Sequence, residues 1–443
     1  MSRKVLILAP LLFLLAACGI KPEGIAITSV DPDGGSTRGG TEVTISGRAF
    51  EAGTVATFGG RTATTVSTED TRLVVSTPSS GNTTGPVDVV VTDPEGNSAT
   101  RTNGYTYTSM LVVANMTSNE LATFDVDRQD PSIMEFTTSP FSAGGISPRG
   151  LGVDFSNRLI FVVNLVGTIS VFNYSMADGS LLAVDGSPFP ANGLQPVAVA
   201  VDRTQHFIFS VNWSSNDICS FIYNASTGAL TLVEAESFGS GGTNPMDVVI
   251  DPLFHLLFVA NSGSNTVAVF SYDANGDLTE VASSPFPSDG LAPSALALDT
   301  SLHLLFVANT DSDTIVAFRY DADGELTQAT GSPIAAGGLA PFALAVDTSS
   351  RFLFVVNKDS NEAVSFTYDS NGVLAAAPGP DVGSGGVAPV ALEIDAANGT
   401  LFVANSTTAD LQLITYASDG SLTASGIPVD AGGMAPFSLV FIP

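Results

Sequence analysis

A repeat of 48 or 49 residues fills this 443-residue chain from about residue 109 to its end. A hydrophobic run ending in Asn recurs seven times, with the Asn at 115, 164, 212, 261, 309, 357 and 405. A Pro keeps the same period, at 148, 196, 245, 293, 341, 389 and 436, and a run of small residues follows it. Self-similarity at this period indicates one supersecondary unit that is repeated around an axis or along a line.

Each repeat holds four short strand-like runs, such as PSALALD, HLLFVAN, TVAVFSYD and DLTEVASS. This pattern predicts a blade of a β-propeller, and seven repeats predict seven blades. The first repeat begins at its second run, at residues 111–115, while the chain stops after an orphan first run, at 436–441. One blade must therefore be built from both ends of the repeat region.

Residues 24–108 have a different pattern, in which short Val, Thr and Ile runs alternate with Gly, Pro and Asp turns. This spacing predicts a small β-sandwich, so the whole chain is expected to be all-β. Gly47 and Gly59 are expected at turns that need a positive φ, which residues with a branched side chain rarely adopt.

The first 17 residues indicate export. Arg3 and Lys4 precede an apolar run from Val5 to Ala17, which is 13 residues long and too short to span a bilayer core of about 30 Å. The run reads as a signal peptide, and its end, Leu-Ala-Ala-Cys-Gly, looks like a bacterial lipobox with Cys18 as the acylated residue. The alternative is an ordinary secretory signal with a chance Cys. We expect a signal peptide at 1–17, a lipidated linker at 18–23 and attachment to the cell envelope through the lipid.

Two family resemblances follow from these motifs. ITSVDP at 27–32, Gly-Gly-Thr at 39–41, FGG at 58–60 and PVDVVVT at 86–92 resemble the IPT/TIG family of immunoglobulin-like domains. LFVAN, VAVFSYD, SPF and P-x-A-L-A-x-D, across residues 109–443, resemble the lactonase-like, YVTN-type seven-bladed propellers, a group that includes bacterial 6-phosphogluconolactonase. The first resemblance implies a spacer or adhesion module. The second implies the fold, because its members include both lactonases and surface proteins without an assigned activity. By resemblance to enterobacterial lipoproteins, Gly19 favours the outer membrane or cell surface.

Composition excludes several classes of function. With 44 acidic and 15 basic residues the net charge is −29, which repels phosphate backbones and argues against nucleic acid as a partner. Two Cys and three His leave few soft ligands, so we predict no metal and no cofactor. The acidic turns 273–277 and 321–325 are interpreted as hairpin turns rather than calcium loops. The three histidines share one repeat position, which indicates packing at a turn rather than catalysis: His206, His255 and His303.

The residue that follows each repeated Pro is expected to face the propeller axis. Five of these seven residues are apolar and Arg149 is the cation among them: Arg149, Val197, Met246, Ser294, Phe342, Val390 and Phe437. A lactone hydrolase needs a base and a group that stabilises the oxyanion, and this ring offers Arg149 with no His or Glu beside it. Arg149 is therefore the catalytic candidate only if the protein is a lactonase; otherwise no catalytic residue is assigned.

The loops that follow the repeated Asn supply two further candidates. Trp213, the sole Trp, and Lys358 stand where other repeats have small polar residues. The predicted ligand-binding residues are thus Arg149, Trp213, Met246, Phe342, Lys358 and Phe437. We favour a lipid-anchored, non-enzymatic protein whose propeller binds a carbohydrate, a peptide or an envelope protein. The alternative is a lactonase-type hydrolase resembling 6-phosphogluconolactonase.

The lipobox generates a direct test. Cys18→Ser should leave the protein unacylated and release it from membranes, because acyl chains would provide its hydrophobic attachment. Membrane fractionation and labelling with palmitate measure this. Persistent membrane association of the variant, with no label in the wild type, would contradict the prediction.

Overall fold

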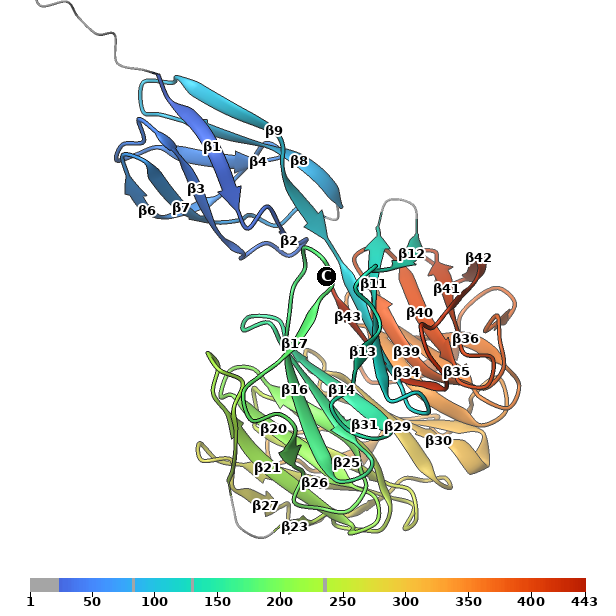
Figure 1. Cartoon of the computed structure of the whole chain (residues 1–443). Coiled ribbons are helices and arrows are strands. Elements are labelled where there is room, and N and C mark those ends of the chain that lie inside the picture. The colour runs from blue at the N-terminus through green and yellow to red at the C-terminus, as the bar shows by residue number, and fades with distance from the viewer. Residues whose placement is uncertain (1–23, 82–83, 129–130, 234–236) are drawn as a thin grey trace, which may run out of the picture.

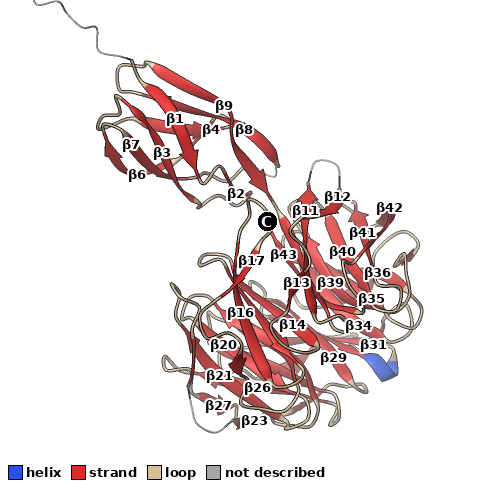
Figure 2. Ribbon diagram, in the orientation of Figure 1, coloured by secondary structure: helices blue, strands red, loops and turns tan. Residues whose placement is uncertain are grey.

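The computed structural model describes residues 24–81, 84–128, 131–233 and 237–443, which form two bodies of strands (Figure 1). Within these ranges the single helical element is a 3-10 turn, Thr310–Ser312, so the predicted all-β class is confirmed (Figure 2). No helix in the described part of the chain is long and apolar enough to cross a membrane. Cys18 lies outside the described residues.

The N-terminal body is a sandwich of two sheets. One sheet has the order β1 (Ala26–Asp31), β3 (Glu42–Arg48), β7 (Arg72–Ser76), β6 (Thr64–Glu69). The other has the order β2 (Gly34–Ser36), β9 (Ser98–Thr108), β8 (Gly85–Thr92), β4 (Val55–Phe58), β5 (Arg61–Thr62). Alternate residues face inward, as in Val43 and Ile45 of β3, and pack against Phe58 and Tyr105 of the facing sheet.

Two glycines of the sandwich show different reasons for their identity. Gly59 has φ 55°, as expected for a turn that needs a positive φ. The same expectation for Gly47 is wrong. A side chain at Gly47 would collide with the carbonyl oxygen of Ala26 and the ring of Phe50, so close approach of the chain is what requires glycine there.

The second body is a ring of seven blades. The innermost strands are β43 (Pro436–Ile442), β14 (Pro148–Asp154), β19 (Pro196–Asp202), β24 (Pro245–Asp251), β29 (Pro293–Asp299), β34 (Pro341–Asp347) and β39 (Pro389–Asp395). The second strands are β10 (Met110–Asn115), β15 (Leu159–Asn164), β20 (Phe207–Asn212), β25 (Leu256–Asn261), β30 (Leu304–Asn309), β35 (Phe352–Asn357) and β40 (Thr400–Asn405). Both lists run blade by blade, and we number the blades 1 to 7 accordingly, so that β43 and β10 belong to blade 1.

The outer half of each blade completes an antiparallel sheet. The third strands are β11 (Glu120–Asp127), β16 (Thr168–Tyr174), β21 (Asp217–Tyr223), β26 (Thr266–Tyr272), β31 (Thr314–Tyr320), β36 (Glu362–Tyr368) and β41 (Asp410–Tyr416). The outer strands are β12 (Ser132–Glu135), β17 (Leu181–Ala183), β22 (Leu230–Leu232), β27 (Leu278–Glu280), β32 (Leu326–Gln328), β37 (Leu374–Ala376) and β42 (Leu422–Asp430). In blades 1 to 6 the third strand also pairs with a two-residue strand: β13 (Phe141–Ser142), β18 (Phe189–Pro190), β23 (Phe238–Gly239), β28 (Phe286–Pro287), β33 (Ile334–Ala335) and β38 (Val382–Gly383).

Blade 1 is built from both ends of the propeller, as predicted. The last strand, β43, pairs antiparallel with β10, so that Leu111 lies opposite Phe441 and Val113 opposite Leu439. In all seven blades the second strand is buried along its whole length, because neighbouring blades cover both of its faces. This explains why these runs are continuously hydrophobic instead of alternating.

A repeated hydrogen bond joins neighbouring blades. The hydroxyl of Tyr223, which ends β21 in blade 3, donates to the carboxylate of Asp154, which ends β14 in blade 2, at 2.7 Å. The other oxygen of Asp154 accepts from the backbone N–H of Ser156 at 2.9 Å, which is the turn role expected for this residue. Four more pairs repeat the Tyr to Asp bond: Tyr272–Asp202, Tyr320–Asp251, Tyr368–Asp299 and Tyr416–Asp347.

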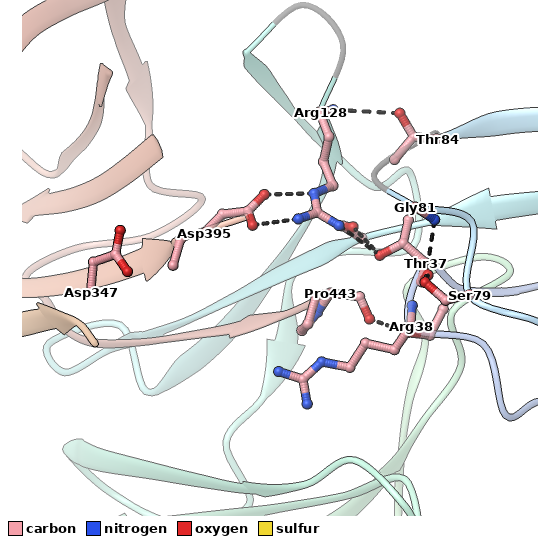
Figure 3. A network of polar contacts seen from close by, with 12 residues as sticks. Thr37, Arg38, Ser79, Gly81, Thr84, Arg128, Asp347, Asp395 and Pro443 are labelled. Atoms are coloured by element: carbon pink, nitrogen blue, oxygen red, sulfur yellow. Dashed lines mark hydrogen bonds and ion pairs between the residues drawn. The ribbon is translucent and has the colours of Figure 1, made fainter. Parts of the chain in front are cut away.

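The seam between blade 7 and blade 1 replaces this bond with an ion pair. Arg128, just beyond β11, donates through Nε and Nη2 to the two carboxylate oxygens of Asp395, at 2.6 and 2.5 Å. Both side chains are buried, with 4% and 3% exposure. Nη1 of Arg128 donates to the hydroxyl of Thr37 at 3.1 Å, so the same guanidinium also holds a loop of the sandwich (Figure 3). The Ser36 hydroxyl adds a contact to the carbonyl oxygen of Pro443.

Truncation after Gly433 tests this closure. It removes β43 and with it Leu439, Val440, Phe441 and Ile442, which are at most 6% exposed. Each buried apolar side chain of this size contributes about 1.5–3 kcal/mol. Their sum is comparable to a typical net stability of about 5–15 kcal/mol, so the truncated protein should aggregate or lose its cooperative melting transition.

The control for this truncation is deletion of residues 24–108. That variant keeps all seven blades and should melt near the wild-type temperature in calorimetry or circular dichroism. A protein truncated after Gly433 that also melts cooperatively at that temperature would show that β43 is dispensable.

Candidate functional site

All seven innermost strands contain a β-bulge at the same place. In blade 2, Pro148 lies opposite Asn164 while Gly150 lies opposite Val163, so Arg149 has no partner across the ladder. The other six innermost strands show the same shift after their Pro. A bulge turns the extra residue away from the regular faces of a strand. Here it directs the residue after each Pro into a cavity on the propeller axis.

The axial cavity has a volume of about 330 Å³ and is lined by residues of all seven blades. The bulged residues lie at one end of it, and the later residues of the innermost strands form its deeper wall. Concave sites of this size accept small ligands. The bulge therefore explains why these seven positions, expected from the sequence to face the axis, do so.

Four of the six predicted ligand-binding residues line this end of the cavity, and a fifth, Lys358, lies over the ring of one of them. The guanidinium carbon of Arg149 lies 4.4 Å from the centre of the Phe437 ring, and Nζ of Lys358 lies 5.2 Å from that of Phe342. The two rings meet edge to face, with their centres 5.9 Å apart. Nη2 of Arg149 also lies 3.8 Å from Sδ of Met246. We call Arg149, Met246, Phe342, Lys358 and Phe437 the mouth cluster.

The mouth cluster concentrates positive charge beside apolar rings. Burial lowers the pKa of Arg149 to about 10, so its guanidinium is still charged at neutral pH. Within the described residues, no carboxylate forms an ion pair with Arg149 or Lys358. Cations placed over aromatic faces are held in position by the ring quadrupole and remain free to meet an anion.

Trp213 does not join this cluster. Its side chain is 39% exposed and it is not among the residues that line the axial cavity. Its backbone carbonyl accepts a hydrogen bond from the side-chain amide of Asn244 at 3.3 Å, which ties the loop to the next blade. Its proposed role in ligand binding remains a prediction without a cavity to support it.

Two carboxyl groups in the cavity were missed by the sequence analysis. Asp247 and Glu393 stand two and four residues after their Pro, and not at the first residue after it, where axial side chains were expected. The ring of residues after each Pro holds no His or Glu, as expected, but the cavity below it holds these two carboxyl groups. Comparing the repeats position by position could have revealed both residues. The other blades have Gly, Ala or Ser at the position of Asp247, and Gly, Ala or Val at the position of Glu393.

The carboxylate of Asp247 accepts hydrogen bonds from the backbone. Its two carboxylate oxygens accept hydrogen bonds from the N–H groups of Leu296 and Val248, at 2.7 and 2.8 Å. Burial raises its pKa to about 6, although both hydrogen bonds act in the opposite direction. The hydroxyl of Ser438 accepts from the N–H of Leu151 in the corresponding way, at 3.2 Å. Asp247 thus has a structural task, linking the innermost strands of blades 4 and 5.

Glu393 has no comparable partner. Its one hydrogen bond within the described structure is a long contact of 3.4 Å from the N–H of Ile394. Burial raises its pKa to about 7, while the side chain stays partly accessible because it faces the cavity. A carboxyl group in this setting can exchange a proton near neutral pH or accept hydrogen bonds from a ligand.

The remaining acidic and histidine candidates have local explanations. The rings of His206, His255 and His303 pack against Tyr223, Tyr272 and Tyr320 of their own blades, as expected for turn residues. In the turn at 273–277, a carboxylate oxygen of Asp273 accepts backbone hydrogen bonds from Asn275 and Asp277, as in an ordinary hairpin turn.

One group of described residues has oxygen atoms spaced closely enough for a metal ion. Glu51, Asp93 and Glu95 of the sandwich place these atoms within 4.8 Å of one another, with Glu51 and Glu95 exposed. A hydrogen bond with Glu95 and the negative charge of Glu95 raise the pKa of Glu51. Exposed acidic groups of this kind are common without an ion, and we assign them no role.

Comparison with protein families agrees with both halves of the structure. A family model described as lactonase, 7-bladed β-propeller, matches residues 106–289, 240–339 and 266–382. A model of the IPT/TIG domain matches residues 26–109. No curated protein matches the chain by sequence.

Solved structures show the same propeller. A periplasmic gluconolactonase of Pseudomonas aeruginosa is 21% identical, with a TM-score of 0.65 over 76% of this chain and 99% of its own. A crystal structure described as a 6-phosphogluconolactonase of Bacteroides fragilis is 19% identical, with a TM-score of 0.65 over 76% and 98%. One of Bacteroides uniformis is 16% identical, with a TM-score of 0.66 over 76% and 99%. The chain therefore belongs to the lactonase family of seven-bladed β-propellers and carries an IPT/TIG domain ahead of the propeller.

Proposed function

We propose that this protein is a lipid-anchored envelope protein whose propeller binds a small carbohydrate with an acidic group at the mouth cluster. The IPT/TIG domain acts as the spacer between the anchor and the propeller. One observation carries the proposal: Arg149 and Lys358 each lie over the ring of a bulged phenylalanine at the opening of the axial cavity. The lipobox around Cys18 supports the anchored location.

The charge distribution supports an acidic ligand. A protein with a net charge of −29 repels anions over most of its surface. An anionic ligand therefore needs a local group of cations that no carboxylate neutralises. Arg149 presents a planar group that can donate two parallel hydrogen bonds to a carboxylate. Lys358 adds a second positive charge at the rim.

The rest of the cavity supports a carbohydrate. The rings of Phe342 and Phe437 offer apolar faces against which the C–H groups of a sugar ring can pack. Deeper in the cavity, Glu393 can accept hydrogen bonds from hydroxyl groups. The small volume favours this ligand over a peptide or an envelope protein, because a stable protein interface buries about 800 Å² on each partner.

Binding of sugar acids tests the proposal. Glucuronate and gluconate should bind the full chain more tightly than glucose in isothermal titration calorimetry. Arg149→Gln and Phe437→Ala should each weaken this binding by about tenfold, which corresponds to about 1.4 kcal/mol. Trp213→Ala is the matched control, since it removes a large aromatic side chain outside the cavity and should leave the affinity unchanged. No saturable binding of any sugar acid, or equal loss in the control, would refute the proposal.

A second candidate function is hydrolysis of a sugar lactone. The observation that favours it is Glu393, a carboxyl group with a pKa of about 7 inside the cavity of a lactonase-family propeller. Such a group can act as a general base that activates water. The separation of the groups weakens this candidate. Arg149 and Glu393 stand at strand positions that differ by three residues, or about 10 Å along a strand.

Lactone turnover distinguishes the two candidates. If Glu393 is a general base, hydrolysis of gluconolactone should exceed the spontaneous rate and should rise with pH through about 7, as the carboxyl group loses its proton. Glu393→Gln should abolish this excess, and Trp213→Ala should retain it. A rate equal to spontaneous hydrolysis at every pH would eliminate the hydrolase, while leaving the binding measurement above unaffected.

A further inference from the structure

A second cavity lies between the sandwich and the propeller, at the opposite ends of the innermost strands from the mouth cluster. Its volume is about 520 Å³, and both domains line it. Arg38 and Thr41 contribute from the sandwich, and Phe155, Arg158 and Arg203 from turns of the propeller. Figure 3 shows Arg38 beside the Arg128–Asp395 pair, with no marked contact at its guanidinium.

Three guanidinium groups meet in this junction cavity. The guanidinium carbons of Arg38 and Arg203 lie 4.4 and 4.7 Å from the centre of the Phe155 ring. Arg158 is among the residues that line the same cavity, and its charge acts on Tyr174. Among the residues that the structure describes, no carboxylate forms an ion pair with any of the three. The negative charge of Asp395 attracts Arg38, but the Asp395 carboxylate already forms an ion pair with Arg128.

Arg38 is repelled by the positive charges of Arg203 and Arg128. Partial burial and then the positive charge of Arg203 lower the pKa of Arg38 below its usual value. Like charges gathered without a counter-charge destabilise a fold unless another group offsets them. In a chain with 44 acidic residues, a cluster of arginines that no carboxylate neutralises is unexpected for a purely structural junction.

The interface between blades 2 and 1 supplies an independent observation. Tyr174 ends the third strand of blade 2, and in five other blades the corresponding Tyr donates to the Asp that ends the preceding innermost strand. The preceding innermost strand here is β43, which ends in Ile442 and has no acceptor. Tyr174 is 5% exposed and lines the junction cavity, and its hydroxyl has no partner among the described residues.

We propose that the junction cavity binds a small molecule through a phosphate or sulfate group, held by Arg38, Arg158, Arg203 and the hydroxyl of Tyr174. The anion takes the place that an Asp carboxylate has at the other blades. Guanidinium groups suit such oxyanions because they donate several charge-assisted hydrogen bonds in a fixed plane. The cavity is larger than a bare oxyanion requires, so it has room for the body of an ester. Because Arg38 belongs to the sandwich, the ligand bridges the two domains.

Titration calorimetry of the full chain tests this site with glucose 6-phosphate as probe, inorganic phosphate as the bare anion and glucose as the neutral control. Glucose 6-phosphate should bind and glucose should not. Arg38→Gln, Arg158→Gln and Arg203→Gln should each weaken binding by about tenfold. Tyr174→Phe, which removes the hydroxyl alone, should weaken it by about fivefold.

Arg351→Gln is the matched control. Arg351 has the repeat position of Arg158 in blade 6 and the same positive φ, 59° against 55°, but does not line the junction cavity. It should leave binding unchanged. Variants of the mouth cluster should also leave it unchanged, which keeps this test separate from that of the proposed function.

A lipid headgroup offers the same phosphate chemistry as a soluble ester. Flotation with phosphatidylcholine vesicles, with and without phosphatidylglycerol, distinguishes the two sources if the chain carries Cys18→Ser, so that no acyl chain contributes. Flotation that needs phosphatidylglycerol and is lost in Arg203→Gln assigns the site to a headgroup. No binding of the esters, phosphate or these vesicles, or equal binding by Arg203→Gln and Arg351→Gln, would overturn the proposal.

Discussion

Each blade of the propeller must pack against two others, and the first and last blades can do so only if the chain closes on itself through β10 and β43. This closure breaks the repeat at one place. The innermost strand of blade 1, β43, ends in Ile442, whereas the other six innermost strands end in Asp. The Arg128–Asp395 pair lies between blades 7 and 1, and the unpartnered hydroxyl of Tyr174 lies where blade 2 meets blade 1. The sandwich docks against residues that follow two strands of blade 1, through Thr37 and Ser36.

The two cavities of the propeller differ in origin. The axial cavity is a property of the repeat, since the same bulge in seven strands directs seven side chains to one place. Differences among those side chains then determine its chemistry, with Arg149 and the two phenylalanines at the opening and Glu393 deeper in. The junction cavity forms where the repeat is interrupted and the sandwich docks. Its arginines come from the sandwich and from the turns that follow β14 and β19.

The features that follow the repeat could be predicted from the sequence. The seven blades, the shared blade 1, the sandwich and the axial position of Arg149 and Phe437 all depend on regular spacing. Asp247 and Glu393 could not be placed with the same ease, because a bulge changes which later residues of a strand face the axis. Arg128 was missed because it stands beyond the strand that should supply a Tyr. The junction cavity depends on how two domains dock, and nothing local in the sequence relates Arg38 to Arg203.

The connection between the domains also determines how the molecule responds to mechanical load. Strand β9 of the sandwich leads into β10 of the propeller with only Ser109 between them. A pull on the sandwich therefore arrives at a strand that is paired on both sides, with β43 and with β11. Force along β10 must shear two ladders of hydrogen bonds at once instead of peeling an edge strand one bond at a time. The closing blade is thus the part of the ring that receives tension from the sandwich, through a strand that is held on both sides.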